Sequence, residues 1–167
     1  MPHQRGGLKF AFDHPYSING DDMGLGKTIQ ALALAEHTGH KALVICPPYL
    51  KENWAHEIRT KLPEWSCSVF KGMSDVREDN LSRILIAGYT QLPAINKVSW
   101  RRGLCIADEV HYLKTPNSKR TEAFHTLLEK WNPPYFMGLS GSIIENRVPE
   151  LYSLLCLPSY DPAKKFG

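Results

Sequence analysis

Four short, mostly apolar segments dominate the hydrophobic pattern of the chain. They run over residues 41–48, 82–90, 103–111 and 135–142, and each is bounded by glycine, proline or polar residues. Short apolar runs rich in Val, Ile, Leu and aromatic residues are typical of strands buried on both faces of a parallel sheet. Two weaker segments of the same kind, at 16–19 and 66–72, extend the predicted sheet.

Between these segments, apolar residues recur at helical spacing. Residues 28–39 place Ile29, Leu32 and Ala33 on one face, with Gly39 as the expected C-cap. Further helices are expected at 51–62, with Trp54, Ile58 and Leu62 on one face, at 119–130, with Ala123, Phe124, Leu127 and Leu128, and at 149–157, which begins with Pro149. Because strand and helix alternate throughout, the pattern predicts a three-layer α/β domain with right-handed crossovers and a mainly parallel sheet.

The length and composition of the chain indicate a single domain. A chain of 167 residues with 43% hydrophobic content suffices for one buried core but not for two ordinary domains. It contains no run of about 18 apolar residues and begins without the apolar segment of a signal peptide, so we expect an intracellular protein. The four cysteines lack metal-ligand spacing and are interpreted as small core residues. The formal net charge of +3 permits a polyanionic partner without requiring one.

The segment DDMGLGKT, residues 21–28, has the properties of a phosphate-binding loop at a helix N-terminus. Gly24 and Gly26 permit a tight backbone path with little side-chain bulk. Lys27 is the expected cation for the outer phosphates of ATP, and Thr28 is the expected hydroxyl ligand of Mg²⁺.

One position departs from the strict pattern G-x-x-x-x-G-K-[ST]. Asp21 stands where that pattern has its first glycine, although Gly20 lies directly before it. The alternative interpretation of the segment is a chance Gly-Lys-Thr turn without a ligand. A second motif elsewhere in the chain argues against that alternative.

The second motif is LCIADEVH, residues 104–111, in which an apolar strand segment ends in two adjacent acids. Ligands of open α/β sheets bind at the carboxyl ends of the strands. Asp108 is therefore expected to hold the magnesium ion, and Glu109 to polarise the water that attacks the γ-phosphate. The alternative is a strand that ends in a solvated acidic turn, which becomes the weaker interpretation once a phosphate loop precedes it.

With these two motifs, the chain resembles the first, RecA-like motor lobe of superfamily-two DNA translocases of the Swi/Snf type. Within that family it is most similar to the annealing-helicase subgroup. Six segments resemble the family motifs in the expected order: the Q motif at 1–12, motif I at 21–30, motif Ia at 43–58, motif Ib at 84–92, motif II at 107–124 and motif III at 138–155. The resemblance covers nearly the whole chain. It implies a P-loop ATP hydrolase of the helicase type with a DEAH-box-like motif II, which here reads DEVH, and with ATP and Mg²⁺ as cofactors.

The resemblance also implies roles for individual residues. Nucleotide binding is assigned to Gln4, Asp21, Asp22, Met23, Gly24, Leu25, Gly26, Lys27 and Thr28. Catalysis is assigned to Lys27, Asp108 and Glu109, with Thr28 and Asp108 as metal ligands. Coupling between the nucleotide and DNA is assigned to His111, Ser140, Gly141 and Ser142, where Ser140 and Ser142 would contact His111 or the γ-phosphate region. Lys51 and Asn53 in motif Ia are the candidates for contact with the backbone of duplex DNA.

Other residues of these motifs have competing interpretations. Trp54 in motif Ia lies on an apolar helix face and is interpreted as a core residue rather than one that stacks on a base. A set of basic residues beside motif II suits a DNA surface and a solvated surface about equally: Arg101, Arg102, Lys114, Lys119 and Arg120. Nothing in the pattern indicates base-specific recognition.

Two departures from the family change the expectation for function. Motif III of the family usually reads S/T-G-T-P, and here Ile143 replaces the proline. The sequence also ends just after motif III, so residues 1–167 are expected to form one lobe, and the second lobe that completes the nucleotide site would act in cis or in trans. The first hypothesis is a DNA-dependent ATPase that moves on or remodels DNA, and the alternative is a remnant that binds nucleotide or DNA without turnover. A small nucleotide kinase fits poorly, because no acceptor-site signature accompanies DEVH.

Overall fold

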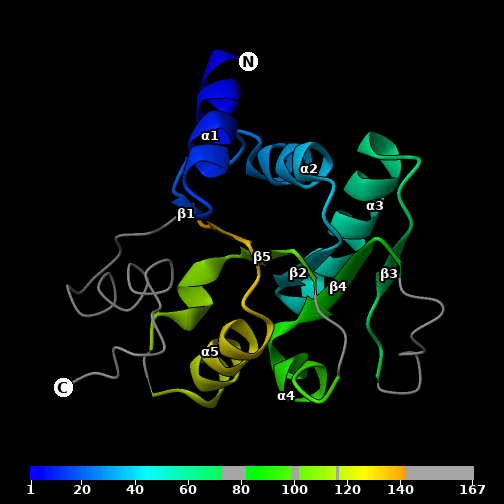
Figure 1. Cartoon of the computed structure of the whole chain (residues 1–167), viewed down its shortest axis with the longest axis vertical. Helices are drawn as coiled ribbons and strands as arrows, with labels where there is room; N and C mark the ends of the chain where they lie inside the picture. Colours follow the sequence, from blue (N-terminus) through cyan, green and yellow to red (C-terminus); the bar gives the residue numbers. More distant parts are fainter. Residues whose placement is uncertain (73–81, 99–101, 116, 142–167) are drawn as a thin grey trace.

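A six-stranded parallel sheet forms the centre of the computed structural model, which describes residues 1–72, 82–98, 102–115 and 117–141 (Figure 1). The strands are β1 (Tyr16–Asn19), β2 (Ala42–Cys46), β3 (Cys67–Val69), β4 (Ile84–Gly88), β5 (Leu104–Asp108) and β6 (Tyr135–Leu139). Their order across the sheet is β1-β6-β5-β2-β4-β3, and every neighbouring pair is parallel. All six segments predicted as strands are therefore confirmed.

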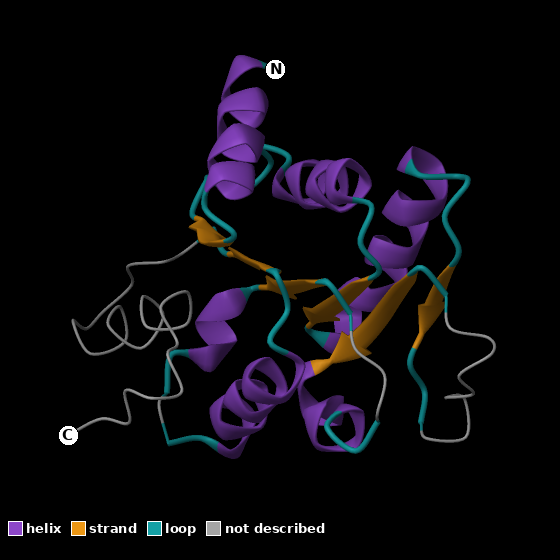
Figure 2. Cartoon of the chain, in the orientation of Figure 1, coloured by secondary structure: helices purple, strands orange, loops and turns teal. Residues whose placement is uncertain are grey.

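Helices cover both faces of this sheet (Figure 2). On one face lie α1 (Pro2–Asp13), α2 (Lys27–Thr38) and α3 (Lys51–Lys61), and on the other lie α4 (Leu92–Ile95) and α5 (Lys119–Trp131). Short 3-10 turns follow three of the strands: η1 (Pro48–Leu50), η4 (Tyr89–Gln91) and η5 (Val110–Leu113). This arrangement confirms the predicted three-layer α/β fold.

Each central strand buries its side chains alternately in two separate cores. In β2, Val44 faces the core under α2 and α3, while Leu43 and Ile45 face the core over α4 and α5. All five residues of β2 and of β4 are buried. Coverage on both faces explains why these strands appear in the sequence as continuous apolar runs rather than as alternating patterns.

The predicted helices form, with one error in the assignment of their faces. In α3, Trp54 and Ile58 are buried as expected, and Gly39 ends α2 in the left-handed conformation with φ 67°. Ile29, however, is 42% exposed, so its assignment to the buried face of α2 was wrong. The buried residues of α2 are Gln30, Ala31, Leu32, Leu34 and Ala35, because the helix contacts α1 and α3 as well as the sheet. The helix expected at 149–157 lies outside the described residues.

The first helix was not predicted from the hydrophobic pattern. It contains the adjacent glycines Gly6 and Gly7, which lower helix propensity. A Cβ atom at Gly7 would lie 2.0 Å from Oε1 of Gln30, so the glycine allows α1 to approach α2 closely.

The described cysteines agree with the prediction in part. Cys46 and Cys105 are buried with free thiols, as expected of core cysteines, whereas Cys67 is only partly buried. No cluster of three or more His, Cys, Asp or Glu suited to a metal occurs among the described residues. None of the helices in the described ranges combines the length and apolar character that a membrane span needs.

Candidate nucleotide site

Three neighbouring strands bring the sequence motifs to one edge of the sheet. Because β6 lies between β1 and β5, Leu139 is level with Asn19 on one side and with Asp108 on the other. The segments that leave these strands start at Gly20, Ser140 and Glu109, and Ser140 N donates to Asn19 O at 3.1 Å. The phosphate loop, motif II and motif III therefore meet at the carboxyl ends of parallel strands, where ligands of such sheets bind.

The loop between β1 and α2 has the backbone that its glycines predict. Gly24 and Gly26 have φ values of 84° and 80°, in the left-handed region that favours glycine. Gly26 directly precedes α2, and its carbonyl accepts the first helical hydrogen bond from Gln30 N at 3.1 Å. The first N–H groups of this twelve-residue helix, and with them its positive end, therefore lie at the loop.

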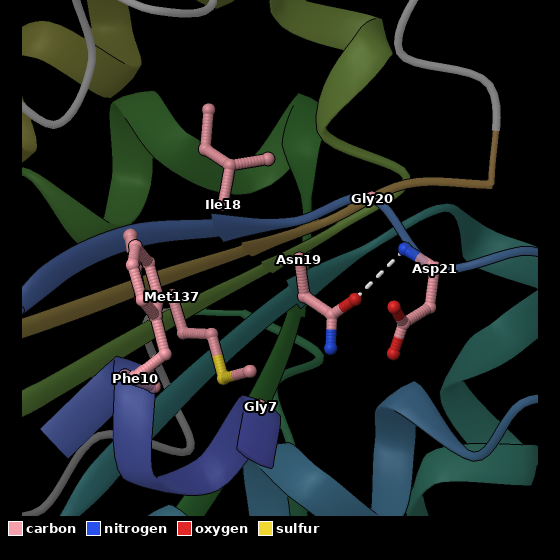
Figure 3. Close-up of a pocket in the computed structure, with 9 residues that line it drawn as sticks. Gly7, Phe10, Ile18, Asn19, Gly20, Asp21 and Met137 are labelled. Atoms are coloured by element: carbon pink, nitrogen blue, oxygen red, sulfur yellow. Dashed lines mark hydrogen bonds between the residues drawn. The ribbon is translucent and has the colours of Figure 1, made fainter. Parts of the chain in front are cut away.

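Asp21, the departure from the strict loop pattern, has a structural role. Its Oδ2 accepts from Nε2 of Gln30 at 2.9 Å, and its backbone N donates to Oδ1 of Asn19 at 2.9 Å (Figure 3). Asn19 in turn donates from Nδ2 to Oε1 of Gln30 at 3.0 Å. These three side chains connect the end of β1, the loop and α2. Asn19 and Asp21 also line a cavity of about 170 Å³ between α1 and the edge of the sheet.

The amine of Lys27 is folded back onto its own loop. Lys27 Nζ donates to the backbone oxygens of Asp21 at 2.6 Å and of Asp22 at 3.0 Å. Motif III lies beside it, because a Cβ atom at Gly141 would lie 3.6 Å from Lys27 Nζ and 2.9 Å from Cγ of Met23. A phosphate bound by Lys27 would take the place of these carbonyl acceptors.

Gln4 reaches the loop from the first turn of α1. Its Nε2 donates to the backbone oxygen of Leu25 at 3.3 Å, and a Cβ atom at Gly26 would lie 2.3 Å from the same nitrogen. The tip of the loop is open to solvent, with Met23 82% exposed and Leu25 40% exposed. Gln4, the Q-motif residue assigned to nucleotide binding, is thus in contact with the phosphate loop.

Asp108 lies at the end of β5 with both carboxylate oxygens engaged. Oδ2 accepts from Nε1 of Trp54 at 2.7 Å, and Oδ1 accepts from the backbone N of Glu109 at 2.9 Å. Burial raises the pKa of Asp108, while these two hydrogen bonds and the positive charge of Lys27 act in the opposite direction. A divalent cation beside the carboxylate would favour its ionised form further.

Glu109 and motif III are connected through His111. Nδ1 of His111 lies 3.2 Å from Oε2 of Glu109 and 3.2 Å from Oγ of Ser140. Of the two contacts that the family resemblance left open for Ser140, with His111 or with the γ-phosphate region, the one with His111 is present. Glu109 itself has φ 52° and ψ 51°, a left-handed conformation that is uncommon for a residue with a side chain and occurs often at functional sites.

The two nucleic-acid candidates on α3 differ in accessibility. Asn53 is exposed on the first turn of α3, whereas Lys51 is partly buried and donates from Nζ to Oε1 of Gln91 at 2.7 Å. Arg102 is only 3% exposed, and its NH1 nitrogen donates to the backbone oxygens of Ala42, Ser82 and Arg83. Including Arg102 in a surface basic cluster was therefore wrong. Ser142, Ile143 and Arg101 lie outside the described residues.

Three residues of the site carried too weak a signal for prediction. Gln30 is a polar residue in an apolar helix, which is the one feature that could have singled it out. Trp54 was correctly assigned to the core, where it is 1% exposed, but its bond to Asp108 joins positions 54 residues apart. Tyr89, whose hydroxyl donates to the backbone oxygen of Asp108 at 2.7 Å, follows β4 and is separated from Asp108 by 19 residues.

Comparison with known proteins agrees with this geometry. The family model described as the SNF2-related domain matches residues 3–166. Switch 2 of Arabidopsis thaliana is 31% identical over 183 aligned positions, which cover 92% of this chain and 20% of that protein. The human DNA annealing helicase and endonuclease ZRANB3 is 30% identical over 144 positions, or 78% of this chain and 13% of that protein.

A solved structure supports the same assignment. The Sulfolobus solfataricus SWI2/SNF2 ATPase core in complex with dsDNA superimposes with a TM-score of 0.79 at 29% identity, covering 93% of this chain and 35% of that one. The chain spans about a fifth or less of the length of Switch 2 and of ZRANB3. With a family model matched over nearly its whole length and an ATPase-core fold, this chain belongs to the SNF2-related domain family.

Proposed function

We propose that the chain is the ATP-binding lobe of a DNA-dependent ATPase of the Swi/Snf type, which couples ATP hydrolysis to movement on or remodelling of DNA. The observation that carries this proposal is the order β1-β6-β5, which brings Lys27, Glu109 and Ser140 to one edge of the sheet. Family membership and the ATPase core with dsDNA among the structural neighbours support the same function.

In the proposed reaction, the chain binds the phosphates and activates water. Lys27 and the N–H groups at the start of α2 bind the outer phosphates. Gln4, whose Nε2 contacts the phosphate loop at the backbone oxygen of Leu25, would recognise the adenine. Glu109 accepts a proton from the attacking water, and the bond between the β- and γ-phosphates breaks to give ADP and phosphate. His111, in contact with both Glu109 and Ser140, connects this step to motif III.

The residues present fit a magnesium ion. Thr28 supplies a hydroxyl at the start of α2 and Asp108 a carboxylate at the end of β5, and hard oxygen donors of this kind suit Mg²⁺. When bound, the ion would neutralise negative charge on the phosphates. We assign Thr28 and Asp108 as its protein ligands.

The proposed partner is the backbone of duplex DNA, contacted from the first turn of α3 by Asn53 and Lys51. Asn53 is the stronger candidate because it is exposed, whereas Lys51 would first have to release Gln91. Contacts with the phosphate backbone do not distinguish one base sequence from another, and the affinity they provide falls steeply as the salt concentration rises. A second lobe, in the same polypeptide or as a partner, would supply the remaining cations around the γ-phosphate.

The test measures binding of MgATP and release of phosphate by this chain, with and without duplex DNA. Lys27→Ala should reduce MgATP affinity at least about tenfold, because the principal phosphate-binding cation is lost. Lys41→Ala removes an equal charge from an exposed position outside the site and should not change the affinity. Equal affinities for wild type and Lys27→Ala would refute the nucleotide site.

Phosphate release by the 167-residue chain alone should stay near background and should not rise with DNA, because one lobe provides only one side of the site. Addition of a second lobe should raise release in a DNA-dependent manner, and Glu109→Gln should abolish that increase. Strong DNA-stimulated release by the single lobe would show that the chain completes its own site. Failure of any second lobe to raise release would favour a remnant that binds without turnover.

A further inference from the structure

The indole of Trp54 is a hydrogen-bond donor to the carboxylate assigned to magnesium. Trp54 lies in α3 and is 1% exposed, and its Nε1 is 2.7 Å from Oδ2 of Asp108. The backbone N of Glu109 holds the other oxygen of this carboxylate at 2.9 Å. With a donor at each oxygen, the orientation of the Asp108 side chain is fixed by two different elements, α3 and the turn after β5.

Asp108 is also held from the opposite face of the sheet. The hydroxyl of Tyr89 donates to the backbone oxygen of Asp108 at 2.7 Å, and Tyr89 is 3% exposed. Both the side chain and the backbone of Asp108 are therefore bonded to neighbouring segments.

Those two neighbouring segments are joined to each other. Lys51, on the first turn of α3, donates to Oε1 of Gln91 at 2.7 Å, and Gln91 lies in the same 3-10 turn as Tyr89. The Oε1 atom of Gln91 also accepts from the backbone N of Gly88 at 2.8 Å. The first turn of α3 and the turn after β4 thus form one hydrogen-bonded unit with two attachments to Asp108.

We propose that Trp54 is a positioning residue that orients Asp108 toward magnesium, and that α3 transmits displacement of its first turn to this carboxylate. The proposal rests on the function proposed above, because Lys51 and Asn53 on that turn are the assigned DNA contacts. Lys51 and Trp54 are one helical turn apart, so they move together as parts of one helix. A shift of a few tenths of an ångström in α3 changes the distance from Nε1 to Oδ2, to which hydrogen-bond strength is sensitive.

A purely structural Trp54 would behave differently in experiment. Its indole fills the core with Ala55 and Ile58, and a substitution that only loosened that core would weaken every ligand alike. Trp54→Phe keeps an aromatic ring in the core and removes the N–H donor. A specific effect on binding that depends on magnesium therefore separates positioning from packing.

The experiment measures nucleotide affinity of this chain with MgATP and with ATP in EDTA. Trp54→Phe should weaken binding of MgATP about tenfold, the size expected when the hydrogen-bond partner of a metal ligand is removed. It should leave binding of metal-free ATP unchanged. Trp65→Phe is the matched control, because Trp65 lies beyond α3 with the Arg83 guanidinium 3.8 Å above its ring, and it should change neither affinity. Equal losses in both conditions, or no loss with MgATP, would overturn the positioning role.

A second measurement reports on the hydrogen bond without any ligand. In the wild-type chain the indole N–H proton of Trp54 should resonate downfield, and Asp108→Asn should move it upfield while the Trp65 resonance stays in place. An unmoved Trp54 resonance would overturn the proposal even if Trp54→Phe fails to fold. If wild type binds no MgATP, the proposed function fails, and this resonance still decides whether Trp54 holds Asp108.

Duplex DNA tests the transmission through α3. Addition of a duplex should shift the Trp54 indole resonance more than that of Trp65, and Asn53→Ala should reduce the shift. DNA binding is measured separately by fluorescence anisotropy of a labelled duplex. Binding without a shift of Trp54 would overturn the transmission while leaving the DNA partner intact, whereas the absence of binding would overturn the partner together with the transmission.

Discussion

Gln30 and Asp21 form a buried link between the second helix and the phosphate loop, with Gln30 Nε2 donating to Asp21 Oδ2 at 2.9 Å. Gln30 is 1% exposed, and its Oε1 accepts from Nδ2 of Asn19 at 3.0 Å. The loop residue that replaces a glycine of the strict pattern is therefore a support for the loop. Its carboxylate is directed at the helix, so its presence does not conflict with an anion-binding loop.

Replacing Gln30 with Met should destabilise the chain by about 1–3 kcal/mol, because Asn19 and Asp21 would lose their partner in a buried position. Urea unfolding followed by circular dichroism measures this difference. Glu36→Gln changes an exposed position on the same helix and should have an effect within about 0.5 kcal/mol. Equal unfolding midpoints for Gln30→Met and wild type would show that the link contributes nothing to stability.

Replacing Glu109 with Gly should raise stability and remove hydrolysis together. The left-handed backbone at φ 52° costs about 1 kcal/mol for a residue with a Cβ atom, and glycine adopts it freely. Thermal unfolding of the chain and phosphate release in the presence of a second lobe measure the two effects.

Asn132 offers a matched control for this trade-off. It caps α5 at φ 42°, away from the nucleotide site, so Asn132→Gly should stabilise the chain slightly and leave phosphate release unchanged. If Glu109→Gly proves less stable than wild type, the backbone at this position is not under strain.

Replacing Asp108 with Asn should change how stability depends on pH. Burial raises the pKa of Asp108 above 3.8, its value in an unfolded chain, so the folded state disfavours the charged form. The contribution of Asp108 to stability is thus fully present below pH 3.8 and is lost as pH rises through the folded pKa. The variant should gain stability relative to wild type between acid and neutral pH. Urea unfolding across this range, with Glu64→Gln as an exposed control, measures the difference, and parallel curves for wild type and Asp108→Asn would contradict the assignment.

Replacing Arg102 with Met should lower the stability of the chain without changing its binding to DNA. Its NH1 nitrogen donates to Ala42 O at 3.1 Å and to two further carbonyls, and burial lowers the pKa of the guanidinium to about 10. Loss of these bonds should destabilise the chain by about 2–3 kcal/mol. DNA affinity, measured by fluorescence anisotropy with a labelled duplex, should fall with salt as steeply in the variant as in wild type. A less steep fall in the variant would show that Arg102 contacts DNA.

The strands and the motif residues could be predicted from the sequence because their signals are local. Each strand of the doubly covered sheet is a continuous apolar run, and the path of the phosphate loop follows from Gly24 and Gly26. The failures concern relations between elements. Ile29 was assigned to the buried face because the sequence does not show that α2 packs against α1 and α3 as well as against the sheet. The helix α1 was not predicted because Gly6 and Gly7 lower its helix propensity.

The hydrogen bonds around Asp108 show the same limit. The donors Trp54 and Tyr89 come from elements that lie beside Asp108 only after the sheet has formed. Neither residue belongs to a pattern within its own segment that points to a carboxylate. Strand order, which hydrophobic periodicity does not specify, decides such contacts.

The position of β6 in the sheet has a consequence for how the lobe is made. In the described part of the chain β1 pairs only with β6, which is the last strand in that part and follows β1 by more than a hundred residues. As the chain leaves the ribosome, the phosphate loop is complete after residue 28, yet its strand has no partner until residues 135–139 emerge. Nascent chains that stop before β6 should therefore not retain ATP, so binding of ATP by a nascent chain would report that synthesis has passed β6.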